Sequence, residues 1–81
     1  MTQPKIVMYT RPNCPDVARA AYALRQLGVT WEEVDIDADP DAKRQVIAWT
    51  GREVTPTLWI GNTMLVEPEA TEIADALAKV S

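Results

Sequence analysis

Cys14 carries the strongest nucleophilic chemistry in this sequence. It lies where the apolar run of residues 5–9 has ended and a helical pattern begins at Pro15. The first N–H groups of a helix lack partners within the helix, and the helix dipole places partial positive charge there. Both effects favour the thiolate, which is the reactive form of cysteine. The junction therefore predicts a reactive thiol, although most free cysteines are buried and inert.

The rest of the composition excludes several other chemistries. The 81-residue chain has one cysteine and no histidine, so an internal disulfide, a cysteine-rich zinc site and Cys–His catalysis are excluded. The net charge of −4 and the lack of a basic stripe argue against nucleic acid as a partner. The acidic run Asp35, Asp37, Asp39 and Asp41 lacks the glycine and distal glutamate of a calcium loop. We expect a solvated turn there and no metal site.

Composition also bounds the domain and its compartment. A hydrophobic content of 47% with mixed charge predicts one folded domain over residues 1–81. No apolar run approaches the ~20 residues of a membrane span. Residues 1–5 lack the basic and apolar regions of a signal peptide. We therefore expect a cytoplasmic protein that does not bind membranes.

A small alternating set of elements must position the thiol. Strand patterns cover residues 5–9, 30–36, 57–60 and 63–66, and helical patterns cover residues 15–27, 40–50 and the segment from Pro68 onward. Gly28 and Gly51 end the first two helices, and Asp39 caps the second, which has Pro40 at its first position. The last helix is predicted to bury Ile73, Leu77 and Val80.

The order of elements is therefore β-α-β-α-β-β-α. Its first βαβ unit should be parallel with a right-handed crossover, and its closing hairpin should be antiparallel. This order predicts an α/β fold in which helices cover both faces of a four-stranded mixed sheet.

Several short segments carry a resemblance to a known family. They are Tyr9-Thr10-Arg11, Cys14-Pro15, Gly51 with Val54-Thr55-Pro56-Thr57, and Ile60-Gly61. Together with the order of elements they resemble the thioredoxin superfamily and, more narrowly, the glutaredoxins, over nearly the whole chain. The resemblance implies a thioredoxin-like (glutaredoxin) fold and Cys14 as the catalytic residue. It also implies substrate contacts from Arg11, Pro15, Val54, Thr55, Pro56 and Glu69.

The same resemblance implies a cis peptide bond before Pro56, with this proline facing the thiol. The backbone of Thr55 would then pair with an extended peptide that contains the reacting thiol. Arg11 has three alternative roles: it stabilises the thiolate, pairs with a substrate carboxylate, or is a solvated loop charge.

The sequence departs from the family pattern at three places. Val17 replaces the second cysteine of the Cys-x-x-Cys pair, so exchange must be monothiol, and Val17 is expected to pack in the core. Val66-Glu67 replaces the Gly-Gly pair that lets glutathione approach the backbone, adding bulk and like charge. Asp16 stands where many relatives have an aromatic residue, and it either opposes the thiolate or stabilises the helix terminus.

Three functions are consistent with these residues. The first is a monothiol thiol–disulfide oxidoreductase in which Cys14 forms a mixed disulfide with a protein disulfide or a glutathionylated protein. It would bind no cofactor and would take glutathione as a co-substrate. The second is a non-catalytic thioredoxin-fold binding module. The third is an iron–sulfur cluster carrier, although Cys14-Pro15-Asp16-Val17 differs from the Cys-Gly-Phe-Ser motif typical of that role. We expect a monomer that forms a Cys14-linked dimer on oxidation.

Overall fold

The computed structural model describes residues 3–80 and has the predicted order of elements. The elements are β1 (Ile6–Thr10), α1 (Pro15–Gln26), β2 (Glu32–Asp35), α2 (Pro40–Thr50), β3 (Thr57–Ile60), β4 (Thr63–Val66) and α3 (Ala70–Val80). The sheet order is β2-β1-β3-β4, with β1 and β2 parallel and the other neighbours antiparallel. The predicted mixed sheet with a parallel βαβ unit and a closing hairpin is confirmed.

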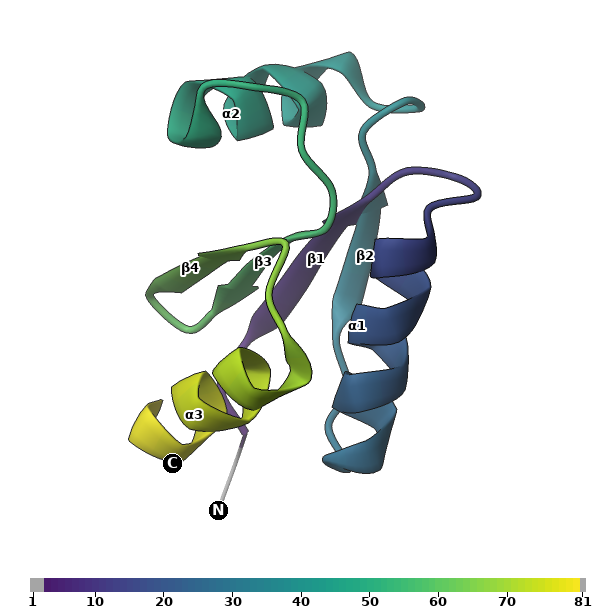
Figure 1. Ribbon diagram of the computed structural model, residues 1–81. Coiled ribbons are helices and arrows are strands. Elements are labelled where there is room, and N and C mark those ends of the chain that lie inside the picture. The colour runs from purple at the N-terminus through teal and green to yellow at the C-terminus, as the bar shows by residue number, and fades with distance from the viewer. Residues whose placement is uncertain (1–2, 81) are drawn as a thin grey trace.

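The helices divide unequally between the two faces of the sheet. Helices α1 and α3 cover one face together, whereas α2 lies near the end of the sheet where β1 and β2 finish (Figure 1). Because side chains alternate along a strand, the larger core forms on the first face, from Ile6, Met8, Ala20, Ala23, Leu24, Leu58, Ile60, Ile73, Ala76 and Leu77. A smaller core under α2 contains Ile36, Ala42, Val46 and Val54 and contacts the sheet at Tyr9 and Val34.

The predicted ends of the first two helices are confirmed by their capping geometry. Cys14 is the N-cap of α1, and Gly28 follows that helix with φ of 73°. The Asp39 carboxylate caps α2 by accepting hydrogen bonds from two backbone N–H groups of its first turn. Gly51 ends α2 with φ of 87°, a left-handed conformation that glycine adopts at little cost.

The last helix differs from its prediction in where it begins and in the burial of its last residue. It begins at Ala70 rather than at Pro68, because the Glu72 carboxylate accepts a hydrogen bond from the N–H of Glu69 at 2.8 Å and so caps the helix there. Ile73 and Leu77 are buried as predicted. The predicted burial of Val80 is wrong, because this residue is the last of the helix, lies beyond the core and is 42% exposed. Among residues 3–80, no helix is long and apolar enough to cross a membrane.

Candidate functional site

Cys14 occupies the turn between β1 and α1. Its backbone is extended (φ −100°, ψ 113°), and its carbonyl accepts the N–H of Ala18 at 3.2 Å. Asn13, which precedes it, has φ of 59° and turns the loop into the helix. The Cys14 side chain is partly exposed and makes no capping hydrogen bond to the first turn. The sulfur therefore lies at the positive end of α1 and remains accessible to a reagent.

Thr55 is the hydrogen-bonding partner of this sulfur. Its hydroxyl donates to Cys14 Sγ at 3.5 Å, and its carbonyl accepts from Sγ at 3.8 Å. The second contact is made by the protonated thiol, and the first remains available when the sulfur is a thiolate. Thr55 therefore provides a partner for both protonation states of Cys14.

The segment around Thr55 is held in place by buried residues on both sides. The Thr55–Pro56 peptide bond is cis, as predicted, and Pro56 is fully buried. Val54 is also buried, within the smaller core under α2. Its side chain therefore fixes the loop, so any contact of Val54 with a substrate must come from its backbone. The carbonyl of Pro56 accepts the N–H of Glu67 at 2.9 Å, which ties this loop to the turn before α3.

A shallow recess surrounds the thiol. It is lined by Arg11, Asn13, Cys14, Pro15, Val17 and Ala18, so the structure brings the predicted residues Arg11 and Pro15 next to the sulfur. Val17 also packs against the larger core, as predicted for a residue that replaces the second cysteine.

Arg11 belongs to an ion-pair cluster that consists of Arg11, Asp37, Lys43 and Glu53. Its Nε lies 3.1 Å from Asp37 Oδ1, and its Nη2 lies 2.8 Å from Glu53 Oε1. Lys43 Nζ is 3.5 Å from the same Asp37 oxygen and 3.4 Å from the same Glu53 oxygen. The hydrogen bonds that Arg11 donates to Glu53 and Asp37 raise the pKa of Arg11, and the hydrogen bonds that Glu53 accepts from Arg11 and Lys43 lower the pKa of Glu53.

The ion-pair cluster bears on the three alternative roles of Arg11. Its guanidinium is engaged by two carboxylates, so it is not an isolated solvated charge. A role toward the thiolate or a substrate carboxylate stays a prediction. Sequence reasoning missed Lys43 and Glu53, because Glu53 is 42 residues from Arg11 and no local pattern joins them.

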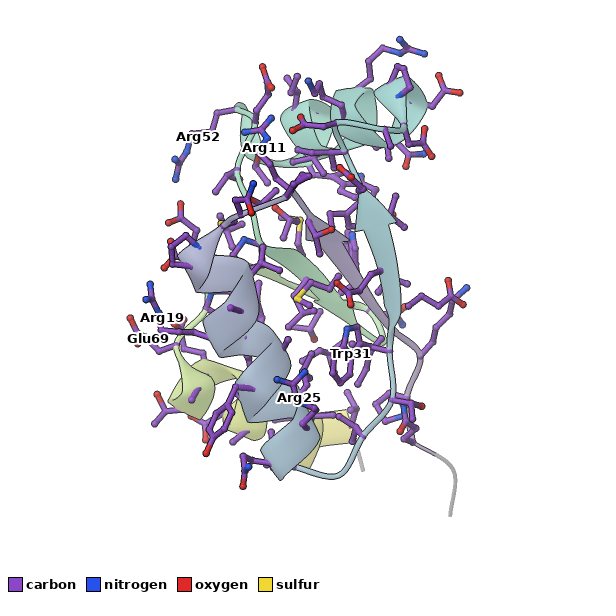
Figure 2. The ribbon with its side chains drawn as sticks, turned by 90° about the vertical axis from the view of Figure 1, so that its right-hand side faces the viewer. Arg11, Arg19, Arg25, Trp31, Arg52 and Glu69 are labelled. Carbon is purple, nitrogen blue, oxygen red and sulfur yellow. The ribbon has the colours of Figure 1, made fainter. Side chains whose placement is uncertain are left out.

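A second set of charged residues lies at the start of α1 and before α3. Asp16 is in the first turn of α1 and pairs with Arg19 one turn later, which supports its interpretation as a helix-stabilising residue. Figure 2 shows Arg11 and Arg52 toward the α2 end of the molecule, and Arg19 and Glu69 farther along, at α1 and before α3. The predicted contact of Glu69 with a substrate stays a prediction.

Glu67 has an unusual backbone for its residue type. Its φ is 47°, in the left-handed region that glycine adopts most readily. The resemblance to the glutaredoxins places a glycine at this position. Here the Glu67 side chain instead pairs with Arg52, whose Nη2 lies 3.3 Å from Glu67 Oε1. Glu67 therefore has the backbone conformation that suits a glycine, although it carries a charged side chain.

Comparison with known proteins agrees with this geometry. A family model described as glutaredoxin matches residues 6–65, which include Cys14, Thr55 and Pro56 and end before Glu67. A glutaredoxin from Pseudomonas aeruginosa is 33% identical over 60 residues, which are 74% of this chain and 71% of the relative. The solution structure of a glutaredoxin from Brucella melitensis superimposes with a TM-score of 0.75 at 28% identity, over 93% of this chain and 83% of that one.

A second solved structure gives a closer superposition. The crystal structure of a thioredoxin-like protein matches with a TM-score of 0.81 at 26% identity, over 90% of this chain and 100% of that one. The two structures support the same four-stranded sheet with three helices.

Proposed function

Because this chain belongs to the glutaredoxin family, whose members are thiol–disulfide oxidoreductases, we propose that it catalyses thiol–disulfide exchange with one thiol, that of Cys14. The observation that carries the proposal is the setting of the sulfur. It is partly exposed at the N-terminus of α1, and it lies 3.5 Å from the hydroxyl of Thr55. These contacts support a thiolate that can attack a disulfide.

The first half of the reaction forms a mixed disulfide. The Cys14 thiolate attacks one sulfur of the substrate disulfide, so that a new S–S bond forms while the old one breaks. The second substrate sulfur leaves as a thiolate with the electron pair of that bond and takes a proton from water. As the attacking sulfur loses its charge, the Thr55 hydroxyl is released to bond elsewhere.

The second half must use thiols from outside the chain, because Val17 stands where a second cysteine would be. One external thiolate attacks the Cys14 sulfur, releases the substrate thiolate and forms a new mixed disulfide with Cys14. A second external thiolate attacks the external sulfur of this mixed disulfide and releases Cys14 as a thiolate. Two external thiols are thereby oxidised to one disulfide for each substrate disulfide that is reduced. Family membership supports glutathione and protein disulfides as the general classes of reactant.

A trapping experiment tests this mechanism. The protein is mixed with hydroxyethyl disulfide at neutral pH, and the mass of the adduct is measured before and after addition of glutathione. We expect one mercaptoethanol adduct on Cys14, which glutathione then removes, and none in Cys14→Ser. A rate of adduct formation no faster than that of a short cysteine peptide would contradict catalysis by this site.

A non-catalytic binding module is the second candidate. The observation that favours it is that Arg11 is held by Asp37 and Glu53, while Val17 is packed against the core. On this hypothesis the recess around Cys14 binds a partner and no turnover follows. The trapping experiment separates the two functions, since a binding module would form the adduct no faster than a short cysteine peptide.

A further inference from the structure

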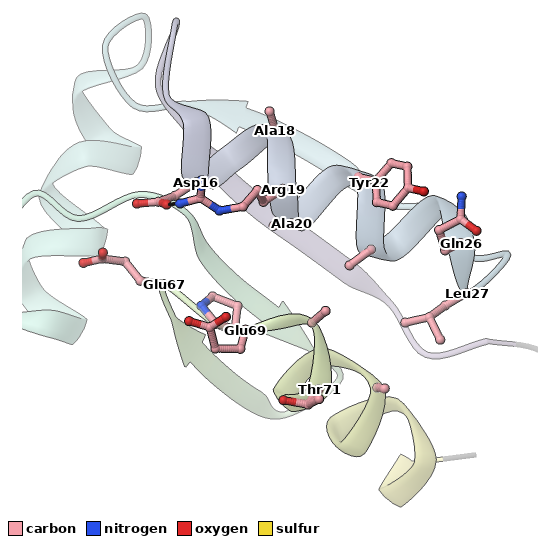
Figure 3. Close-up of a pocket in the computed structure, with 14 residues that line it drawn as sticks. Asp16, Ala18, Arg19, Ala20, Tyr22, Gln26, Leu27, Glu67, Glu69 and Thr71 are labelled. Atoms are coloured by element: carbon pink, nitrogen blue, oxygen red, sulfur yellow. Dashed lines mark ion pairs between the residues drawn. The ribbon is translucent and has the colours of Figure 1, made fainter.

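A groove of about 760 Å³ runs between α1 and the start of α3 (Figure 3). Its apolar lining residues are Ala18, Ala20, Tyr22, Ala23, Leu27, Pro68, Ala70 and Ala74. Tyr22 is 61% exposed and Leu27 is 43% exposed, although both are large and carry apolar surface. This exposed apolar surface is available to an occupant of the groove.

The groove adjoins the recess around the thiol. Ala18 lines both, and Asp16 lies two residues after Cys14. On the opposite wall, Glu67 lines the groove and donates its N–H to the carbonyl of Pro56. A chain bound to Cys14 through a disulfide is therefore within reach of the groove.

The charges of the groove are unbalanced. Three carboxylates, of Asp16, Glu67 and Glu69, line it together with one guanidinium, that of Arg19. Asp16 pairs with Arg19, and Glu67 pairs with Arg52. Within residues 3–80, no cationic group pairs with the Glu69 carboxylate. The groove therefore favours a cationic occupant and disfavours an anionic one.

The length of the groove indicates the size of that occupant. Lining residues extend along α1 from Asp16 to Leu27, a distance of about 16 Å at the helical rise per residue. An extended chain of about five residues spans the same distance. A peptide segment fits these dimensions, whereas a small thiol would fill only the end near Cys14.

We propose that the groove binds the segment of a protein substrate that adjoins its reacting cysteine. An apolar side chain of that segment packs over Tyr22 and Leu27, and a lysine or arginine pairs with Glu69. This inference rests on the proposed function, since it describes which part of a protein substrate is bound when that substrate reacts with Cys14.

Activated peptides test the inference. A five-residue probe contains one cysteine bound to 5-thio-2-nitrobenzoate, with leucine and lysine in the remaining positions. A matched probe has glutamate in place of lysine, and both are made with the cysteine at either end. Attack by Cys14 on the peptide sulfur joins the peptide to the protein and releases thionitrobenzoate, which is measured by its absorbance. We expect the lysine probe to react about fivefold faster than the glutamate probe, the size of one exposed ion pair.

Two variants test the apolar part of the site. Tyr22→Ser and Leu27→Ser should each slow the reaction of the lysine probe, by about fivefold for the lost apolar contact. Val80→Ser is the matched control, because Val80 is 42% exposed and does not line the groove. The reaction of Val80→Ser with neutral hydroxyethyl disulfide should match that of the wild type.

The outcomes separate the inference from the proposed function. Equal rates for the two probes, with normal reaction of hydroxyethyl disulfide, would overturn the inference about the groove. The proposed function would then still stand. Failure of both probes and of hydroxyethyl disulfide would overturn the proposed function itself. If Leu27→Ser dissociates a wild-type dimer in light scattering and leaves the probe rates unchanged, a second copy of the chain covers the groove and the inference is wrong.

Discussion

Two charged walls flank Cys14, and they differ in how their charges are paired. In the ion-pair cluster, two cations, Arg11 and Lys43, meet two carboxylates, Asp37 and Glu53. Along the groove, three carboxylates face one guanidinium, and Glu69 has no ion pair within residues 3–80. Paired charges hold loops together, whereas an unpaired charge can attract a ligand. On the proposal made above, the cluster supports the site and the groove selects the substrate.

Removing the thiol should have the largest effect on activity. Neither charged wall can influence the exchange reaction when the Cys14 sulfur is absent. Cys14→Ser should abolish exchange with every disulfide, since a serine hydroxyl is not nucleophilic without an adjacent base. The melting temperature should stay near that of the wild type, because the serine hydroxyl can still bond to Thr55. Turnover and thermal unfolding are the measurements, and retained turnover would remove Cys14 from the mechanism.

The hydroxyl of Thr55 belongs to neither wall and should influence all substrates equally. Thr55→Val removes the donor that lies 3.5 Å from Cys14 Sγ. We expect mixed-disulfide formation at neutral pH to slow by roughly tenfold for both charged and neutral disulfides, the effect of losing a hydrogen bond to a charged group.

Thr57→Val is the matched control for this prediction. The Thr57 hydroxyl donates to the carbonyl of Val54 at 2.9 Å and does not reach the sulfur. This variant should lose about 1 kcal/mol of stability with little change in thiol reactivity. An equal loss of reactivity in both variants would show that Thr55 acts only through the loop.

Glu67→Gly should change substrate choice with little effect on stability. It removes a carboxylate and side-chain bulk beside Pro56, so the rate with glutathione as the external thiol should rise by about threefold. Relief of the left-handed backbone, about 1 kcal/mol, is offset by the entropy of glycine. Arg52→Ala breaks the same ion pair but keeps the carboxylate, so it should not raise the rate with glutathione. A similar rise in both variants would assign the effect to the ion pair and not to Glu67.

Glu53→Gln, on the cluster wall, should have the smallest effect and should act on stability alone. Hydrogen bonds from Arg11 and Lys43 lower the pKa of Glu53 below its ordinary value of 4.5 in the folded protein. The carboxylate therefore stabilises the fold at neutral pH, and this contribution is lost as the pH falls through the lowered pKa. The difference in melting temperature between the wild type and Glu53→Gln should be present at pH 7 and should shrink below pH 4.5.

Glu33→Gln gives the control for that comparison, since it removes one carboxylate from the exposed first half of strand β2. It should not reproduce the acid-dependent difference. A change in the preference between lysine and glutamate probes in Glu53→Gln would contradict the division of roles between the two walls.

Local features of the fold could be read from the sequence because their causes lie within a few residues. Asp39 and Gly51 marked the ends of α2, since caps depend on adjacent backbone groups. The last helix was placed two residues early because the capping bond between Glu69 and Glu72 competes with Pro68 as a start signal.

The site was only partly predictable because its contacts join residues that are far apart in the sequence. The family resemblance predicts that Pro56 faces the thiol, but the hydrogen bonds between Cys14 and Thr55, which are 41 residues apart, are not predicted by any local pattern. The ion-pair cluster joins charged residues that could equally well be exposed to solvent without a partner, so their types alone do not predict the pairing. The groove depends on the placement of α1 against α3, so Tyr22 and Leu27 carry no sequence signal that separates them from an ordinary exposed helix face.

The replacement of a second cysteine by Val17, which packs against the larger core, has a consequence for damage by oxidants. When peroxide converts a cysteine to sulfenic acid, a neighbouring thiol usually condenses with it before further oxidation. This chain has one cysteine, and the side chain one turn away is an apolar part of the core. Sulfenic acid at Cys14 therefore proceeds to the irreversible sulfinic acid unless a thiol from another molecule arrives first, so the supply of such thiols sets the lifetime of the site under oxidative stress.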